Sequence, residues 1–248
     1  MLEDLRFAFR QLVKSPGFTL IAIFALALGI GANTAIFSMV DAVLLRPLPY
    51  PAADKLIVMR ERSSVFERGA VSYMNWLDWH AEQRSFNDLA LVRRESFNFS
   101  PGTSGDPPER IRGVRASAGF ISELGLKPLI GRDLTPAEDL DGAPNVALIS
   151  EGLWRKHFGG SPEVLGRRAL IDGLEREIVG VFPASLQFGR SPDVLIPLGE
   201  IVKDEGMQSR DNHQGFSALG RLKPGVTMAQ ANSDLDAIAA DLEKKYPK

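Results

Sequence analysis

The hydrophobic pattern of the chain is dominated by one uncharged run of 23 residues, at positions 18–40. As an α-helix this run would span about 34 Å, and the hydrocarbon core of a bilayer is about 30 Å thick. A cleaved signal peptide would have a shorter apolar core of about 7–15 residues and a small-residue cleavage site, and residues 36–41 offer no convincing one. A buried helix of a soluble protein would be shorter and would carry a polar stripe. We therefore predict a transmembrane helix and assign residues 18–45 to it.

The residues before the run form two faces when they are placed on a helix. The apolar face holds Leu2, Leu5, Phe9 and Leu12, and the basic face holds Arg6, Arg10 and Lys14. This pattern is typical of a helix in the membrane interface, and the alternative is a frayed basic tail, since three turns are few for an isolated helix. Only Arg46 and Lys55 follow the run closely, so the positive-inside rule predicts a cytoplasmic amino terminus and an exported carboxyl side. Residues 1–17 form this predicted interfacial segment.

Small residues recur within the predicted membrane helix. Ala27, Gly31 and Ala35 have a four-residue spacing, which lets another helix approach closely in lipid. Asn33 lies beside them, and its amide prefers a polar partner to lipid. The alternative is that Ala and Gly are simply common in membrane helices. We predict that these four residues form a helix-packing face.

After the run, short strands alternate with short capped helices. The pattern predicts strands at residues 56–59, 89–92, 97–100, 110–116, 146–149, 169–171, 177–182 and 194–197. Helices are predicted to begin at Ser72, Ser117, Thr135 and Ser150. Asp172 and Gly173 separate two of the strands and predict a hairpin turn, because this pair accepts positive φ angles. We predict an α+β fold, in which a single amino-terminal transmembrane helix precedes a two-lobed mixed α/β domain over residues 46–248.

A longer helix is predicted at the carboxyl end. Thr227 and Gln230 have the spacing of a capping box. A single apolar stripe follows at intervals of three and four residues, formed by Met228, Ala231, Leu235, Ile238 and Leu242.

Composition narrows the possible functions. Three of the 29 basic and two of the 31 acidic residues lie within positions 1–17, so 26 basic and 29 acidic residues remain, a net charge of −3. This charge, and the lack of a basic cluster in the sequence, argue against nucleic-acid binding. The sequence has no cysteine, which excludes disulfides, thiol catalysis and cysteine-ligated metals.

The sequence offers no catalytic, cofactor-binding or metal-binding motif. His80 and His157 lie in apolar helical settings, where a packed or capping imidazole is the usual case. Asp211, Asn212 and His213 could hold a cation, but no second group of ligands at a recognised spacing supports such a site. The stretch nearest to a phosphate-binding loop, residues 160–167, has the wrong spacing and no Lys-Ser pair. We predict that the chain is not an enzyme and needs no cofactor.

Segments along nearly the whole chain resemble one family of membrane proteins, the MacB/FtsX-type ABC transporter permeases. The resemblance is closest to the duplicated orphan permease group, which has a MacB-like periplasmic core domain. The matching segments are DLR at 4–6, RQL at 10–12, KSPGFT at 14–19, GIGANTAIF at 29–37, VLLRPLPY at 43–50, VSY at 71–73, WLDW at 76–79, GR at 131–132, GLW at 152–154, FGG at 158–160, IVGV at 178–181 and RLKPGVT at 221–227.

The resemblance implies a permease component of an ABC-type efflux transporter in the bacterial inner membrane. It implies a periplasmic domain of two subdomains, one of them a strand-rich lobe inserted near residues 112–200. Three more transmembrane helices and a separate or fused ABC ATPase are also implied, together with a second permease copy in a dimeric assembly. Such transporters work by mechanotransmission, in which ATP-driven motion on the cytoplasmic side moves the periplasmic domain.

In this interpretation the predicted residues act structurally. Ala27, Gly31, Asn33 and Ala35 pack against other helices, and Leu235, Ile238 and Leu242 couple the domain to the membrane bundle. The sequence ends at Lys248, on the helix that should lead to a second membrane helix, so we expect either a fragment or a truncated gene. The alternatives are a stand-alone, membrane-anchored periplasmic binding or sensing module and an anchored hydrolase. Three further apolar runs of about 20 residues encoded beyond Lys248 would favour the permease.

Overall fold

A computed structural model of the protein describes residues 2–41, 49–62, 68–102 and 107–247. The chain divides into two compact units, Met1–Leu48 and Pro49–Lys248, and each is described by itself. The last residues assigned to the membrane segment, 42–45, and most of the VLLRPLPY segment lie outside the described residues.

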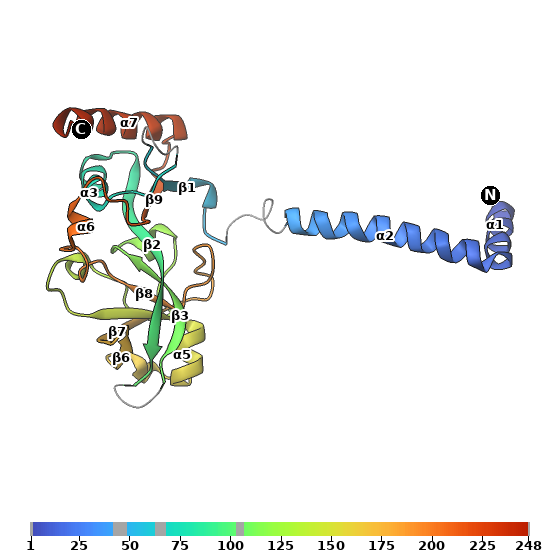
Figure 1. Ribbon diagram of the computed structural model, residues 1–248, viewed down its shortest axis with the longest axis horizontal. Helices are drawn as coiled ribbons and strands as arrows, with labels where there is room; N and C mark the ends of the chain where they lie inside the picture. Colours follow the sequence, from blue (N-terminus) through green and yellow to red (C-terminus); the bar gives the residue numbers. More distant parts are fainter. Residues whose placement is uncertain (1, 42–48, 63–67, 103–106, 248) are drawn as a thin grey trace. The chain divides into compact units, whose positions relative to one another are not determined.

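The first unit consists of two helices, α1 (Leu2–Lys14) and α2 (Pro16–Val40) (Figure 1). Proline stands at the first position of α2, where its fixed φ suits a helix start. The Thr19 hydroxyl donates to the Leu12 carbonyl at 2.6 Å and to the Ser15 carbonyl at 3.0 Å, and these bonds hold the elbow between the helices. On α1, Leu12 and the three predicted basic residues are exposed, and the side chains of Leu2, Leu5 and Phe9 lie outside the description.

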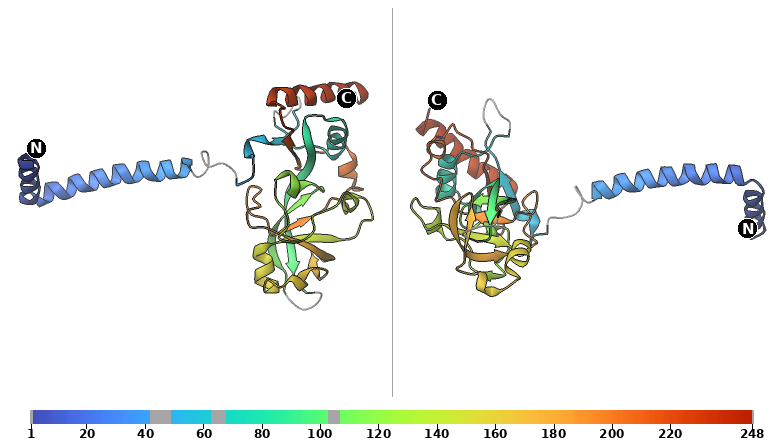
Figure 2. Two further views of the ribbon diagram at one scale, coloured as in Figure 1. Left: turned by 180° about the vertical axis from the view of Figure 1, so that it is seen from behind. Right: turned by 60° about the horizontal axis from the view of Figure 1, so that its bottom comes forward.

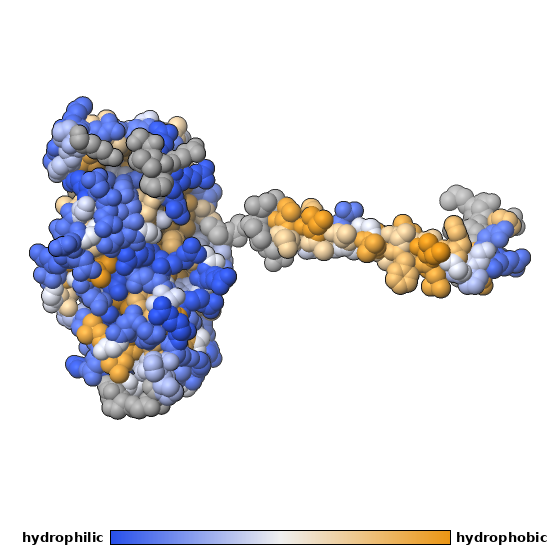
Figure 3. All heavy atoms as spheres, viewed as in Figure 1, coloured by the Kyte–Doolittle hydropathy of each residue, from blue (hydrophilic) through white to orange (hydrophobic). Residues whose placement is uncertain are grey.

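Helix α2 is long and apolar enough to cross a membrane, and none of its residues is buried within the chain. Hydrophobic side chains cover much of it, whereas hydrophilic residues cover most of the visible face of the second unit (Figure 3).

The second unit is built on one mixed sheet, which has nine strands among the described residues. The strands are β1 (Leu56–Met59), β2 (Phe86–Ser100), β3 (Glu109–Ala116), β4 (Ile130–Gly131), β5 (Val146–Ser150), β6 (Arg168–Ile171), β7 (Leu174–Phe182), β8 (Val194–Ile196) and β9 (Ser217–Leu222). They lie in the order β1-β9-β2-β3-β8-β5-β7-β4, and β6 pairs with both β2 and β7.

Six of these strands close into a barrel. Successive pairing runs through β2, β3, β8, β5, β7 and β6, and β6 returns to β2 where Phe99 lies opposite Ile171. Closure leaves fewer free strand edges in this part of the sheet. All six strands contribute to one buried apolar cluster, which includes Phe97, Phe99, Ile111, Ala147, Ile149, Ala169, Ile171, Ile178, Val194 and Ile196. We call this part of the domain the barrel.

Strand β2 differs from the sequence prediction. We predicted two strands, at 89–92 and 97–100, and the structure forms one continuous strand. The charged residues between the predicted pieces continue the pairing with β3, with Arg93 opposite Arg115 and Glu95 opposite Gly113. Glu95 pairs with both Arg93 and Arg115, so the strand does not have to end where the apolar pattern ends.

Several capped helices were predicted correctly. Ser72, Ser150 and Thr227 cap α3 (Tyr73–Glu82), α5 (Glu151–Phe158) and α7 (Met228–Lys245) with side-chain hydrogen bonds. The helix predicted from Ser117 is only one turn, α4 (Phe120–Glu123), because Gly119 at its start has a φ of 87°. Thr135 precedes a 3-10 turn, η3 (Pro136–Asp139), rather than an α-helix. The remaining short elements are η2 (Ala53–Lys55), η4 (Pro162–Val164) and α6 (Glu205–Gln208).

The hairpin between β6 and β7 turns as predicted. Asp172 and Gly173 both have positive φ angles, 51° and 77°. The second strand is longer than predicted, because it starts at Leu174, directly after the turn.

Two further apolar clusters lie outside the barrel. One packs α4 against β2, β3 and β9, and it includes Tyr50, Val92, Phe120 and Leu219. The other, which we call the α7 cluster, lies at the end of the sheet formed by β1, β9 and the first half of β2, where it is covered by α3 and α7 (Figures 1 and 2). It includes Trp76, Trp79, Phe86, Phe216 and Ile238.

Candidate functional site

The predicted helix-packing residues lie on α2. Ala27, Gly31, Asn33 and Ala35 are all exposed. Nothing lies within 4 Å of the point that a Cβ on Gly31 would occupy. The first unit therefore leaves all four residues free, and their role in helix packing stays a prediction. Ala27, Gly31 and Ala35 lie on one face of α2, whereas Asn33, two residues from Gly31 and Ala35, lies on another side of the helix.

The predicted coupling residues lie on α7, where they face the domain. Ile238 is buried, and Leu235 and Leu242 are partly buried against the α7 cluster. On the same helix, Asp234 accepts hydrogen bonds from the backbone amides of Arg84 (2.8 Å) and Ser85 (3.1 Å). The stripe thus attaches α7 to the sheet, and any coupling to a membrane bundle would pass through α7 together with the domain.

Arg221, near the end of β9, makes five hydrogen bonds to residues far away in the sequence. Its Nη1 donates to the carbonyls of Pro51 (2.7 Å) and Ala52 (2.9 Å), the first residues of the unit. Its Nε and Nη2 donate to the Glu123 carbonyl at the end of α4, at 3.0 and 2.8 Å. The Arg221 amide donates to the Glu123 carboxylate at 2.7 Å. We call this arrangement the Arg221 clamp.

The clamp is completed by residues that fix the backbone around Pro51. The Tyr50 hydroxyl donates to the Gln187 carbonyl and accepts from the Gln187 amide at 2.8 Å. Ala52 has a positive φ of 45°, which is uncommon for a residue other than glycine. On the other side, Gly125 has a φ of 74°, and a Cβ there would lie 3.3 Å from the Pro51 ring. The start of the unit is therefore held at several points.

We did not predict the clamp, although both parts of it lie in or beside segments that carried the family resemblance. Arg221 opens RLKPGVT, and Pro51 follows VLLRPLPY. The turn 223–225 then leads from β9 directly into α7. One side chain thus joins the start of the unit to the strand that precedes its last helix.

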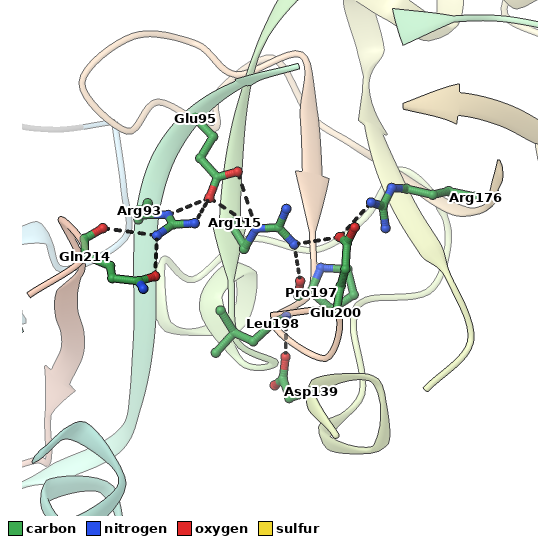
Figure 4. Close-up of polar contacts among 9 residues, drawn as sticks. All are labelled: Arg93, Glu95, Arg115, Asp139, Arg176, Pro197, Leu198, Glu200 and Gln214. Atoms are coloured by element: carbon green, nitrogen blue, oxygen red, sulfur yellow. Dashed lines mark hydrogen bonds and ion pairs between the residues drawn. The ribbon is translucent and has the colours of Figure 1, made fainter. Parts of the chain in front are cut away.

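A second polar feature lies at the mouth of the barrel (Figure 4). It alternates three arginines with two glutamates, in the order Arg93, Glu95, Arg115, Glu200 and Arg176, and we call it the charged layer. On β2, Glu95 lies on the same face as Phe97 and Phe99, because side chains alternate along a strand. The Arg115 guanidinium also lies 5.8 Å from the centre of the Phe97 ring. The layer therefore covers the apolar barrel interior.

Two arginines of the charged layer are buried, whereas Glu200 is exposed. The Arg115 and Arg176 side chains are 7% and 2% exposed. Arg115 donates to Glu95 at 3.1 Å and to Glu200 at 3.0 Å, and Arg176 donates to Glu200 at 2.7 Å. Burial raises the pKa of Glu200, but its pairs with Arg176 and Arg115 outweigh burial and hold that pKa below its ordinary value. Within the described residues the Nε of Arg176 is buried and has no partner, so the layer is not fully satisfied.

Asp139, at the end of η3, joins two loops beside this layer (Figure 4). Its carboxylate accepts from the amide of Ala118 at 2.6 Å and from the amide of Leu198 at 3.1 Å. Burial raises the pKa of Asp139 to about 6, against the lowering effect of these two hydrogen bonds. This carboxyl therefore titrates closer to neutral pH than an ordinary aspartate.

The three histidines pair with carboxylates. Each Nε2 lies close to a carboxylate oxygen, at 2.8 Å for His80 and Asp88 and at 2.6 Å for both His157 with Glu109 and His213 with Glu61. The hydrogen bond to Asp88 raises the pKa of His80, against the effect of burial. A search of the described residues finds no group of three or more His, Asp or Glu side chains placed to hold a metal ion.

Comparison with known proteins identifies the family. Residues 19–238 match the family model of the MacB-like periplasmic core domain. The chain belongs to this family, as the sequence resemblance predicted. A search of curated proteins gave no match.

Solved structures share the fold. The periplasmic region of MacB from Actinobacillus actinomycetemcomitans is 16% identical, with a TM-score of 0.55 over 76% of this chain and 84% of that one. A domain of a protein described as a permease, from Porphyromonas gingivalis, is 18% identical, with a TM-score of 0.58 over 80% and 87%. The extracellular domain of the noncanonic ABC-type transporter YknZ from Gram-positive bacteria is 13% identical, with a TM-score of 0.53 over 76% and 93%.

These findings confirm the predicted fold class, one candidate membrane helix followed by a mixed α/β domain. The family match supports a permease component of ABC-transporter type, whose extracytoplasmic domain follows the candidate membrane helix. The inserted lobe predicted near residues 112–200 stays a prediction.

Proposed function

We propose that the chain is the amino-terminal part of an ABC-type efflux permease that works by mechanotransmission. In this proposal an ABC ATPase drives motion on the cytoplasmic side, and the first membrane helix carries that motion to the periplasmic domain. The amino terminus is cytoplasmic, the membrane is the bacterial inner membrane, and further helices or a second permease copy complete the assembly. The exposed face with Ala27, Gly31 and Ala35 provides the packing surface for those helices, and the exposed Asn33 contacts a neighbour on another side of α2.

The Arg221 clamp is the observation that carries the proposal. A displacement that reaches Pro51 acts on Arg221 through two hydrogen bonds, and Arg221 lies in the strand that leads into α7. On α7, the predicted coupling residues Leu235, Ile238 and Leu242 bind the helix to the α7 cluster. In this proposal, the beginning of the domain is connected to α7 through Arg221, β9 and the turn at 223–225.

The barrel supports the proposal of an inserted lobe. Strands β3 to β8 lie within residues 109–196 and include five of the six barrel strands. Because β2 belongs both to the barrel and to the sheet beside the α7 cluster, it would carry motion from one to the other.

The proposal is tested by following domain motion in the assembled transporter, with the remaining helices and the ATPase present. The chain has no cysteine, so a pair of spin labels at Glu163→Cys in the barrel and Asp236→Cys on α7 would report one distance without background labelling. We expect ATP to change the distance distribution between these labels. Arg221→Ala should remove most of that change while ATP hydrolysis continues, because the residue lies outside the ATPase.

Arg110→Ala, an exposed arginine in the barrel, is the matched control and should behave like the parent chain. Circular dichroism would show that Arg221→Ala is still folded. If ATP changes no distance in the parent chain, or if Arg221→Ala preserves the full change, mechanotransmission through the clamp is wrong.

A further inference from the structure

A third polar cluster lies between α3 and the last turn of α7. It consists of Glu61, Asn75, Asp78, Arg210 and Tyr246, and we call it the Arg210 cluster. These residues come from the segment after β1, from α3, from the loop before β9 and from the end of α7. The cluster therefore joins four parts of the chain that lie far apart in sequence.

Arg210 is at its centre. Its Nη1 donates to the side-chain oxygen of Asn75 at 2.7 Å, and its Nη2 pairs with Asp78 at 2.7 Å. Asn75 and Asp78 are three residues apart on α3 and so face the same way. The guanidinium carbon lies 3.8 Å from the centre of the Tyr246 ring, a close cation–π contact. One flat side chain therefore binds α3 through its edge and the end of α7 through its face.

Glu61 extends the cluster to β1. It accepts hydrogen bonds from the Asn75 side-chain nitrogen at 3.0 Å and from the Ser72 amide at 2.9 Å, and its other oxygen pairs with His213 at 2.6 Å. The Asn75 side chain donates a hydrogen bond to Glu61 through its nitrogen and accepts one from Arg210 through its oxygen, so a single amide connects the two charged groups.

The end of α7 has few other attachments. Its buried residues are Ala231 and Ile238, which lie in its first three turns. After Ile238, only Leu242 among the described residues of the helix is partly buried, and Tyr246 is 42% exposed. A helix end with so little buried surface frays unless a specific contact holds it. The Tyr246–Arg210 contact is placed to do this.

We propose that Arg210 is a positioning residue that fastens the carboxyl end of α7 to α3 and, through Asn75 and Glu61, to β1. When Arg210 contacts Tyr246 and α3, the whole length of α7 moves together with the β1 edge of the sheet. When the contact between Arg210 and Tyr246 is broken, only the first three turns of α7 follow the sheet. The consequence for transport rests on the proposed function, whereas the fastening itself does not.

Hydrogen exchange on the full chain in lipid nanodiscs tests the fastening. Arg210→Ala should speed exchange of the amides at residues 240–246 roughly three- to tenfold and leave those at residues 231–238 unchanged. Arg210→Lys should give an intermediate result, because an ammonium group cannot bind Asn75 and Asp78 in the same forked way. Lys203→Ala, which removes an exposed positive charge elsewhere, is the control and should change neither segment. Unchanged exchange at 240–246, or equal acceleration along all of α7, would overturn the proposal.

The role in motion is tested separately in the assembled transporter. Spin labels at Glu82→Cys on α3 and Glu243→Cys on α7 would report the position of the helix end. Arg210→Ala should broaden this distance distribution, and an unbroadened distribution would count against the fastening. If ATP moves neither this pair nor the barrel pair in the parent chain, the proposed function fails, but the hydrogen-exchange result still decides the fastening.

Discussion

The two ends of the sheet are held together in different ways. At the barrel end, six strands close on one another around side chains such as Phe97, Phe99 and Ile171, which are at most 1% exposed. At the other end, β1 is an edge strand, and α7 buries only Ala231 and Ile238 fully. Apolar packing holds the barrel, and the α7 cluster packs the other end around Trp76 and Phe216. The attachments of the domain start and of the end of α7, however, depend on single polar side chains, Arg221 and Arg210.

This difference matters for the proposed function, in which the domain transmits displacement. A closed, densely packed barrel resists deformation, because any change in its shape opens voids or creates overlaps. Directional contacts such as hydrogen bonds and ion pairs can break and re-form without exposing an apolar core. We therefore interpret the barrel as the part that is moved and the α7 end as the part through which motion enters. The charged layer lies where the two meet.

The largest expected effect on stability comes from a substitution in the core of the barrel. Phe99→Ala removes a fully buried ring from the centre of its core and should lower the free energy of unfolding by about 3–5 kcal/mol. Chemical denaturation of the full chain in detergent, followed by tryptophan fluorescence, would measure it. Leu242→Ala, at a partly buried residue near the end of α7, is the truncation at the other end and should cost less, about 1–2 kcal/mol. Equal losses for the two variants would contradict the comparison.

A smaller effect concerns the border between the two ends, where Asp139 joins the loops at Ala118 and Leu198. The pKa of Asp139 is raised by burial from 3.8 to about 6 in the folded chain. A raised carboxyl pKa contributes stability below the unfolded pKa, and this contribution is lost as the pH rises through the folded pKa. As the pH rises from 4 to 7, ionisation of Asp139 should lower the free energy of unfolding by up to about 3 kcal/mol.

The measurement is the difference between the parent chain and Asp139→Asn across this pH range. Asparagine cannot ionise, so the variant should lack this part of the pH dependence, although it has a lower baseline because its amide nitrogen cannot accept a second backbone bond. The charge on Glu138 raises the pKa of Asp139 and that on His80 lowers it, so both residues are kept unchanged. Parallel pH profiles for the two proteins would show that Asp139 does not titrate in this range.

The parts of the fold that sequence patterns predicted are those held by local chemistry. Caps at Ser72, Ser150 and Thr227, and the turn at Asp172, need only residues three or four positions away. Strand β9 escaped prediction because its sequence, SALGRL, lacks both alternation and β-branched residues. It forms a strand because it pairs with β1 on one side and with β2 on the other. The fit is close, since a Cβ on Gly220 would lie 2.5 Å from the Leu89 side chain.

The polar sites could not be predicted either, because they also depend on contacts between residues that are far apart in the sequence. The partners of Arg221 are 98 residues away at Glu123 and 170 residues away at Pro51, so no periodicity connects them. Their only trace in the sequence was the family resemblance of the segments around them. Arg93 and Glu95 were interpreted as a break in a strand, because charge predicts exposure unless the opposite charge is known to be near.

The smallest expected effect on the domain comes from the helix-packing face of α2, where the change should leave both ends of the sheet intact. Gly31→Leu fills a position with nothing within 4 Å in the chain itself, so the free energy of unfolding of the second unit should not change. If a neighbouring helix packs there in lipid, the larger side chain should weaken co-purification with the remaining membrane helices, because close approach depends on small residues. Ala32→Leu, one residue further along and on another face, is the control and should co-purify normally. Unchanged assembly with Gly31→Leu would rule out this face as a contact, and the proposed function would then need a different contact surface on α2.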